Sequence, residues 1–236
     1  MNTLHHFGDS YATIIPTNNN KHFCEIIANI LKINYKGFGK KGLSNEQMLD
    51  EIIQNIKNFQ KGDIVFINFS FLTRGCYYDT FDNEIKSSNK LYNDIEKYIY
   101  KPYFPIHEKE KIMILIDYYT KHTEDYAKKI FKLFNSIIEY LENLEIKIFY
   151  IFLDDNDYVD TLLKFGTNIK FKKGFCKWLI ENNFHKGTDV HYTMGIQPML
   201  ADVIIRKTNN LSNKESVCIT IDDIDKTKII KASKIF

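Results

Sequence analysis

At 236 residues the chain has the length of one domain, or of one domain with a tail. Its hydrophobic fraction of 44%, with 14% aromatic residues, is enough for a sizeable core and excludes global disorder. The 32 basic and 30 acidic residues nearly cancel, and Arg74 and Arg206 are the only arginines, so the charge gives no case for nucleic acid as the main partner.

Targeting signals and cysteine pairs are not evident. Met1 is not followed by the basic and apolar regions of a signal peptide, and no apolar run approaches the roughly 20 residues of a membrane helix. The four cysteines form no CxxC pair, which is typical of reduced, intracellular cysteines and not of a zinc site. We therefore expect a cytoplasmic protein with no membrane partner, no cofactor and no metal.

The first seventy residues alternate between strand and helix patterns. The apolar run Thr3–Phe7 predicts a strand, and apolar residues at helical spacing predict a helix over residues 20–31. Ile33–Tyr35 fits a short second strand, followed by a glycine-punctuated loop. Ser44–Phe59 is expected to be a helix with a capping box at its start, and Ile64–Phe69 is typical of a strand buried in a parallel sheet.

The middle of the chain is less regular. Residues 70–89 are polar and rich in tyrosine, which predicts a long loop of the kind that forms active-site lids. Residues 91–100 fit a helix, and residues 112–118 fit a strand or a helix equally well. The longest helical pattern covers residues 123–144, and Ile146–Phe152 is another strand of the buried type.

The last third continues the alternation. The elements expected here are a helix at residues 158–163, a strand at 169–171, and helices at 176–182 and 193–206. A loop that holds Asp189 and His191 precedes the last helix, and residues 216–221 and 228–235 have strand character. Strands that alternate with helices predict an α/β sandwich with a mainly parallel sheet.

A candidate nucleophile follows the first strand. Gly8 permits a sharp turn, and Ser10 then precedes a helix whose free N–H groups stabilise negative charge. Ser10, Asp189 and His191 have the residue types of a triad, in which the serine attacks, the histidine is the base and the aspartate orients it. Because parallel strands end at one edge of a sheet, the loops after the first three strands are expected to meet there.

An oxyanion hole is expected at the same edge. The backbone N–H groups of Ser10 and Gly42 are candidate donors, and the side-chain amide of Asn45 or Asn68 completes the set. Structural roles stay open for both amides: Asn45 fits the first turn of a helix capped by Ser44, and Asn68 fits a bond to neighbouring backbone.

These motifs resemble the SGNH (GDSL-like) hydrolases over residues 3–206. The first block of that family is matched by Phe7-Gly8-Asp9-Ser10, the second by Gly42, and the last by Asp189-Val190-His191 before the terminal helix. The Gly-x-Ser-Asn form of the second block resembles a subgroup seen in large tailed phages and some bacteria. The resemblance implies a three-layer α/β/α sandwich with a flavodoxin-like sheet for residues 1–206, and leaves 207–236 as a β-rich extension.

The chain departs from the family pattern in two places. The usual Gly-x-Asn-Asp third block is absent, and Ser70 and Arg74 stand where the subgroup carries a Ser or Thr and a nearby Arg. Arg74 fits a surface ion pair as well as a substrate contact. Many members have the aspartate three residues before the histidine, whereas Asp189 lies two residues before His191.

The resemblance implies a metal-independent serine esterase. Its substrate is expected to be a small acyl ester, such as an O-acetyl group on a carbohydrate. Two alternatives stay open: a catalytically weak or inactive glycan-binding or structural module, for example of a phage particle, and an acyltransferase that uses the same residues. The C-terminal extension is expected to extend the sheet or to join subunits, in a homo-oligomer or in a virion.

Two adjacent histidines occupy the first predicted strand. Because side chains alternate across a strand, His5 and His6 are expected on opposite faces, one of them against a helix. A metal-binding role is not expected for either of them.

Overall fold

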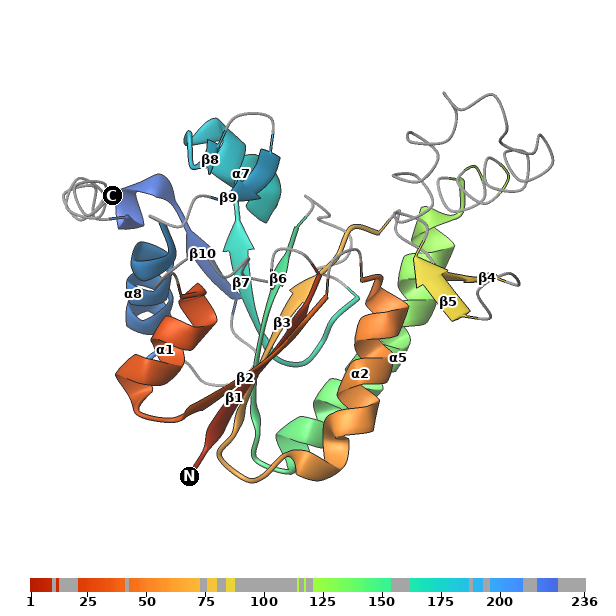
Figure 1. Ribbon diagram of the computed structural model, residues 1–236, viewed down its shortest axis with the longest axis horizontal. Coiled ribbons are helices and arrows are strands. Elements are labelled where there is room, and N and C mark those ends of the chain that lie inside the picture. The colour runs from red at the N-terminus through yellow and green to blue at the C-terminus, as the bar shows by residue number, and fades with distance from the viewer. Residues whose placement is uncertain are drawn as a thin grey trace.

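A computed structural model describes the chain in several segments. The described residues are 1–9, 12, 21–40, 43–72, 76–79, 84–87, 114, 117, 121–153, 162–186, 189–192, 196–209 and 216–224. For residues 76–79, 84–87, 185–186 and 189–192 the description covers the backbone alone. Within these segments one parallel sheet lies between two layers of helices (Figure 1).

Six strands form the sheet in the order β10-β7-β6-β3-β1-β2, and every neighbouring pair is parallel. Their bounds are β1 Thr3–Gly8, β2 Asn34–Gly39, β3 Ile64–Phe69, β6 Lys147–Phe152, β7 Thr167–Phe171 and β10 Ser216–Ile219. Without β10 the strands follow the flavodoxin-like order 2-1-3-4-5. The predicted α/β sandwich with a mainly parallel sheet is therefore confirmed.

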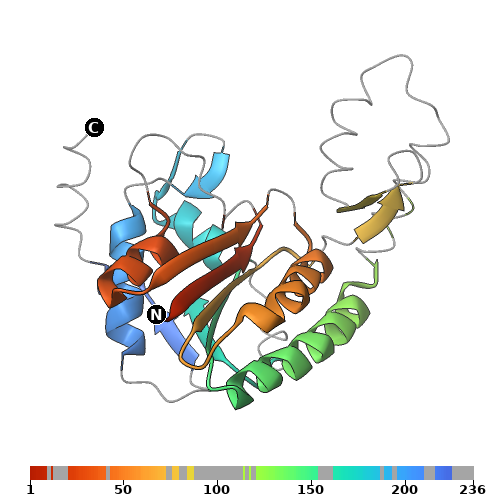
Figure 2. The ribbon, with the colours of Figure 1, turned by 60° about the horizontal axis from the view of Figure 1, so that its bottom comes forward.

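Helices cover both faces of the sheet (Figure 2). One face carries α1 (Phe23–Leu31), α7 (Phe175–Glu181) and α8 (Gln197–Thr208), and the other carries α2 (Asn45–Asn55) and α5 (Thr123–Asn143). Two separate apolar cores result, because side chains of each buried strand alternate between the two helical layers.

Helix α5 shows how the sequence pattern produces this packing. Its buried side chains recur every three or four residues, which places them on one stripe facing the sheet. Phe131 and Phe134 in that stripe meet the ring of Phe69 on β3 edge to face, at centroid distances of 5.1 and 4.8 Å. Burying each such ring contributes roughly 1.5–3 kcal/mol, so these contacts anchor the helix to β3.

Several predicted boundaries were wrong, and β2 is the most instructive. The second strand was expected to end at Tyr35, yet it continues through two glycines to Gly39. Its register against β1 explains the extension, because Thr3 to Gly8 pair one by one with Asn34 to Gly39. Strand propensity disfavours glycine, but pairing with a buried neighbour outweighs that preference here.

Local hairpins were missed in two segments that were expected to be loops. Residues 70–89 contain β4 (Cys76–Asp79) paired with β5 (Glu84–Ser87), and the segment before the last helix contains β8 (His185–Lys186) paired with β9 (Asp189–Tyr192). Both hairpins pair outside the main sheet, so neither carries the long apolar run that marked the other strands.

The remaining helical and strand predictions differ mainly at their ends. Helix α2 stops at Asn55 and continues as a short 3₁₀ turn, Ile56–Asn58, and α8 begins at Gln197 instead of residue 193. The tail strand β10 pairs with β7, so part of the tail extends the sheet. Another 3₁₀ turn, Ile221–Asp223, follows it.

Some predictions fall wholly or partly outside the described residues. These are the helix at 91–100, most of the helix at 158–163 and the strand at 228–235. In the ambiguous segment 112–118, Ile114 and Asp117 are described and both are helical. Among the helices described, none combines the length and apolarity that a membrane crossing requires.

Candidate active site

The candidate site lies at the carboxyl edge of the sheet, between β1 and β3. The chain crosses from β1 to β2 through α1 on one face and from β2 to β3 through α2 on the other face. Loops at such a reversal of strand order diverge and leave a crevice, which is where ligands bind in open α/β sheets. Asp9 directly follows β1 and Ser70 directly follows β3, so both residues stand at this point.

Asp9 and Ser70 connect the two strand ends. The Ser70 hydroxyl donates a hydrogen bond to Asp9 Oδ2 at 3.2 Å, and both residues are buried. A buried carboxylate that accepts such a bond ties the end of β1 to the end of β3, because the bond is shielded from solvent. Ser70 was predicted as an oxyanion or substrate contact. In the structure its hydroxyl is bonded to Asp9, and its predicted contact with substrate stays a prediction.

Two glycines form a floor under the turn that follows Asp9. The Ala12 N–H donates to the Asp9 carbonyl at 3.0 Å, which closes a turn of four residues. A Cβ added to Gly8 would lie 2.6 Å from Ala12 Cβ, and one added to Gly39 would lie 2.7 Å from the Ala12 backbone. Gly8 and Gly39 are register partners on β1 and β2, so together they let the turn approach the sheet.

Gly39 is a site residue that the sequence prediction assigned to a loop. The signal was present in the glycine spacing of Gly37-Phe38-Gly39, but the spacing alone does not say which glycine faces another chain segment. The register with Gly8 supplies that information.

Asn45 joins the second block to the third strand. Its Nδ2 donates to the Ser70 carbonyl at 3.1 Å, and its Oδ1 accepts from the Ser70 N–H at 2.9 Å. Asn45 is fully buried at the start of α2, directly after the N-cap Ser44, whose predicted capping box with Gln47 is present. One N–H of the Asn45 amide is thus engaged with backbone, and the amide has a second.

Asn68 is the second predicted amide, and it lies on β3 beside Gly8. It is fully buried, and neither its Nδ2 nor its Oδ1 makes a hydrogen bond of good geometry within the described segments, although the amide has a weaker contact with the His6 ring. The alternative in which it bonds neighbouring backbone is therefore not seen there. A buried amide without such bonds costs free energy, which marks the position as unusual for a merely structural residue.

The catalytic residues predicted from the motifs are only partly described. Ser10, Gly42 and Arg74 lie outside the described residues, and Ser10 falls in sequence between Asp9 and Ala12. Asp189 and His191 belong to β9, for which the backbone alone is described. The β8–β9 hairpin lies beyond the carboxyl edge of the sheet, next to α7 (Figure 1).

One hydrogen bond links the two chain segments that carry these residues. The N–H of Phe23, the first residue of α1, donates to Gln197 Oε1 at 2.8 Å. Gln197 is buried and opens α8, six residues after His191, while α1 follows Ser10 in the sequence. The starts of α1 and α8 are thereby held together at the same end of the sheet.

No protein-family model and no curated protein matches this sequence. Solved structures do resemble it. A lipolytic G-D-S-L family protein from Veillonella parvula is 13% identical with a TM-score of 0.44, covering 89% of this chain and 100% of its own. An acetylxylan esterase from Geobacillus stearothermophilus is 12% identical with a TM-score of 0.42 and coverages of 87% and 93%. A G-D-S-L family protein from Desulfitobacterium hafniense is 10% identical, with a TM-score of 0.38 and full coverage of both chains.

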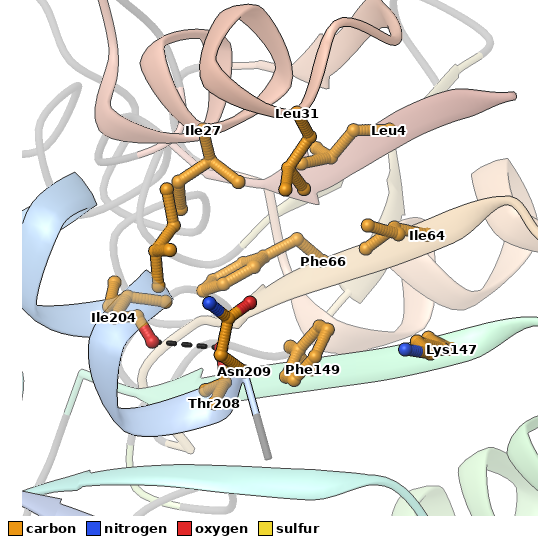
Figure 3. A pocket seen from close by; sticks show the side chains of 11 residues that line it. Leu4, Ile27, Leu31, Ile64, Phe66, Lys147, Phe149, Ile204, Thr208 and Asn209 are labelled. Atoms are coloured by element: carbon orange, nitrogen blue, oxygen red, sulfur yellow. Dashed lines mark hydrogen bonds between the residues drawn. The ribbon is translucent and has the colours of Figure 1, made fainter. Parts of the chain in front are cut away.

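A pocket between α1, α8 and the sheet lies away from this edge (Figure 3). Its volume is about 100 Å³, and it is lined by Leu4 and Ile64 near the starts of β1 and β3, by Leu31 at the end of α1 and by Thr208 at the end of α8. The walls are mainly aliphatic and aromatic, and no residue of the predicted triad or oxyanion hole lines them. The chemistry of the predicted motifs therefore does not belong to this pocket.

Proposed function

We propose that the protein is a serine esterase that hydrolyses small acyl esters, such as O-acetyl groups on carbohydrate. The observation that carries the proposal is the convergence of the motif-bearing segments at one sheet edge. Hydrogen bonds from Ser70 to Asp9 and from Phe23 to Gln197 connect the ends of β1 and β3 and the starts of α1 and α8. Ser10, Asp189 and His191 have the residue types and the chain order of a triad, and they are the proposed catalytic groups at this edge.

The proposed reaction passes through an acyl-enzyme. Ser10 Oγ attacks the ester carbonyl while His191 takes its proton, and Asp189 orients the histidine ring. The tetrahedral intermediate expels the alcohol, which receives the proton from His191. Water then loses a proton to His191 and attacks the acyl carbon, and Ser10 leaves with that proton as the acid is released.

The negative charge that develops on the carbonyl oxygen needs fixed donors. Backbone N–H groups of Ser10 and Gly42 are the proposed pair, and the second N–H of the Asn45 amide is the proposed third donor. Because the other N–H and the oxygen of Asn45 bind the Ser70 backbone, its side chain is already oriented before substrate arrives. A donor fixed in this way needs no reorganisation during the reaction.

The glycine floor and Asp9 are proposed to position the nucleophile and to take no chemical part. Gly8 and Gly39 bring the turn from Asp9 to Ala12 close to the sheet, and Asp9 is held by Ser70. An attacking atom must be placed within a fraction of an ångström, and a displacement of about 1 Å costs roughly 100-fold in rate. Such support suits a nucleophile that lies between Asp9 and Ala12 in the sequence.

The triad assignment is tested by comparing two histidines of one hairpin. His191→Asn should lower kcat for p-nitrophenyl acetate by at least about 1,000-fold, since the base is lost. The matched control is His185→Asn, because His185 lies on β8 opposite Tyr192 in the same hairpin, and its activity should stay within about twofold. Equal losses in both variants would contradict the assignment of His191 as the base.

One observation favours a second candidate, a glycan-binding or structural module with a weak or inactive site. The residue at the third-block position, Ser70, uses its hydroxyl on Asp9, so its side chain does not stand free as an oxyanion donor. The two candidates differ in turnover: a module would bind acetylated xylo-oligosaccharides and release no acetate. Adding a carbohydrate acceptor distinguishes hydrolysis from acyl transfer, because a transferase forms an acylated acceptor in place of free acetate.

A further inference from the structure

A cluster of potential metal ligands lies between β1 and α1, apart from the proposed triad. His6 belongs to β1, His22 is the N-cap of α1, and Cys24 lies in the first turn of that helix. One ligand atom from each residue lies within 4.8 Å of the other two, and all three residues are buried, with exposures of 1% or less. This cluster was not anticipated from the sequence, because His6 stands sixteen positions before His22.

The fold explains why these side chains meet. Side chains on a strand alternate, so His6 faces the α1 side of the sheet while His5 faces Phe59 on the opposite side. The first turn of α1 packs on that face, and the rings of His6 and His22 lie 4.4 Å apart between centroids. Two imidazoles and a thiol are thus brought together without any bound group.

We propose that His6, His22 and Cys24 bind one thiophilic d¹⁰ cation, Zn²⁺ or Cu⁺, at a structural site between β1 and α1. Thiolate and imidazole are the ligands that such ions prefer, whereas Mg²⁺ and Ca²⁺ prefer oxygen. Around a tetrahedral ion with these ligands, donor atoms lie about 3.3–3.6 Å apart. Atoms already within 4.8 Å therefore need to move by only about 1 Å to close around the ion.

An independent feature of His6 supports the site. Its Nδ1 lies 3.1 Å from the Tyr35 hydroxyl, and its Nε2 is buried with no hydrogen bond of good geometry among the described residues, only a weaker contact of the ring with Asn68. A ring nitrogen left in that state is costly, and metallation of either nitrogen places the single ring proton on the other. Tyr35 and Asn68 are the polar neighbours of the ring and would then act as the outer-shell partners that orient a metal-bound histidine.

Metal binding changes the protonation of the cluster in a defined way. Burial raises the pKa of the Cys24 thiol well above its ordinary value, so the metal-free cysteine carries its proton. The ion displaces that proton to solvent as the metal–sulfur bond forms, so one proton is released for each ion that binds. Cys24 lies at the N-terminus of α1, where the helix dipole favours the resulting thiolate.

His22 caps α1 in the metal-free state and must give up this capping hydrogen bond when it binds the ion. In the metal-free state its Nδ1 accepts a hydrogen bond from the Cys24 N–H at 3.1 Å, which caps α1. Coordination through Nδ1 replaces this bond directly, and coordination through Nε2 puts the ring proton on Nδ1. Either way the Cys24 amide loses its acceptor, so its exchange with solvent reports on metal binding independently of any activity.

The site is tested with purified full-length protein stripped of metal and titrated with Co²⁺, Zn²⁺ and Cu⁺. We expect one ion per chain by elemental analysis and, with Co²⁺, a near-ultraviolet thiolate-to-metal charge-transfer band. Competition with chelators selective for Zn²⁺ or Cu⁺ tells which ion is bound more tightly. Failure of all three ions to bind, or Co²⁺ binding without the thiolate band, would overturn the proposal.

Variants distinguish this cluster from other metal-binding groups on the chain. Cys24→Ser should abolish the charge-transfer band, and His22→Asn, which keeps a side chain able to cap the helix, should weaken affinity at least tenfold. The matched control is Cys176→Ser, which removes another buried cysteine of the same core and should change neither the band nor the affinity. If Cys24→Ser does not fold, the His22→Asn titration and the wild-type Cys24 amide exchange decide, and unchanged values in both would refute the site.

Discussion

The glycine floor makes a quantitative prediction about the turn that contains the proposed nucleophile. In Gly39→Ala the new methyl group would lie 2.7 Å from the carbonyl carbon and oxygen of Ala12. Ordinary contact begins at 3.4 Å, so the turn or the strand must shift by about 0.7 Å. Overpacking of this kind costs about 1–3 kcal/mol of folding free energy, and a shift near 1 Å at the nucleophile costs roughly 100-fold in rate.

Gly37→Ala is the matched control on the same strand. There the added methyl would lie 2.8 Å from the hydroxyl of the Tyr35 side chain, and not from the backbone of Ala12. Turnover of p-nitrophenyl acetate and urea unfolding measure both variants. We expect Gly39→Ala to lose about 10- to 100-fold in kcat/KM and Gly37→Ala to lose less than threefold. Full activity in Gly39→Ala would refute the claim that this turn must sit close to the sheet.

Three further outcomes follow from the buried polar contacts. Asn45→Ala removes both hydrogen bonds to the Ser70 backbone and should lower the free energy of unfolding in urea by about 1–3 kcal/mol. The control Asn55→Ala, in the same helix, should lower it by less than about 1 kcal/mol. Equal losses would contradict the claim that the Asn45 bonds stabilise the fold. Asp63→Ala removes a carboxylate that accepts from three buried or half-buried donors and should cost about 3 kcal/mol, a loss below 1 kcal/mol being inconsistent with those bonds. In chelator-treated protein, the free energy of unfolding should fall as pH drops below about 6.5, by at most about 1.4 kcal/mol per pH unit. The reason is that burial lowers the pKa of His6 to about 3, so only the unfolded chain takes up the proton in this range. Urea titrations at several pH values should show a shallower dependence of this free energy on pH in His6→Gln.

The sheet and its helical layers could be predicted because local patterns of apolar residues mark most of their strands and helices. Ile64–Phe69 and residues 146–152 are apolar runs with few polar interruptions, and the stripe of α5 repeats at helical spacing. Such segments need no knowledge of their partners to be recognised. The carboxyl edge as the place of the candidate site followed from the parallel order of these strands.

The features that the sequence did not predict depend on contacts between residues far apart in the chain. Gly37 and Gly39 have the pattern of loop residues until the register with β1 is known. Asp189 and His191 belong to β9, which pairs with a strand of two residues that carries no apolar run. The two-fold contact of Asn45 with Ser70 joins residues 25 positions apart, and the cluster of His6 with His22 and Cys24 likewise depends on how α1 docks. Tertiary packing, and not local propensity, decides each of these.

The most direct test of the account is active-site labelling of the purified protein with a fluorophosphonate. The proposed function predicts one phosphonyl adduct per chain, located on Ser10 by peptide mass analysis, and no adduct in Ser10→Ala. Ser136→Ala, a change on the exposed face of α5, is the control and should label like the wild type. Labelling that persists in Ser10→Ala, or an adduct found on another serine, would contradict the central claim that Ser10 is the nucleophile.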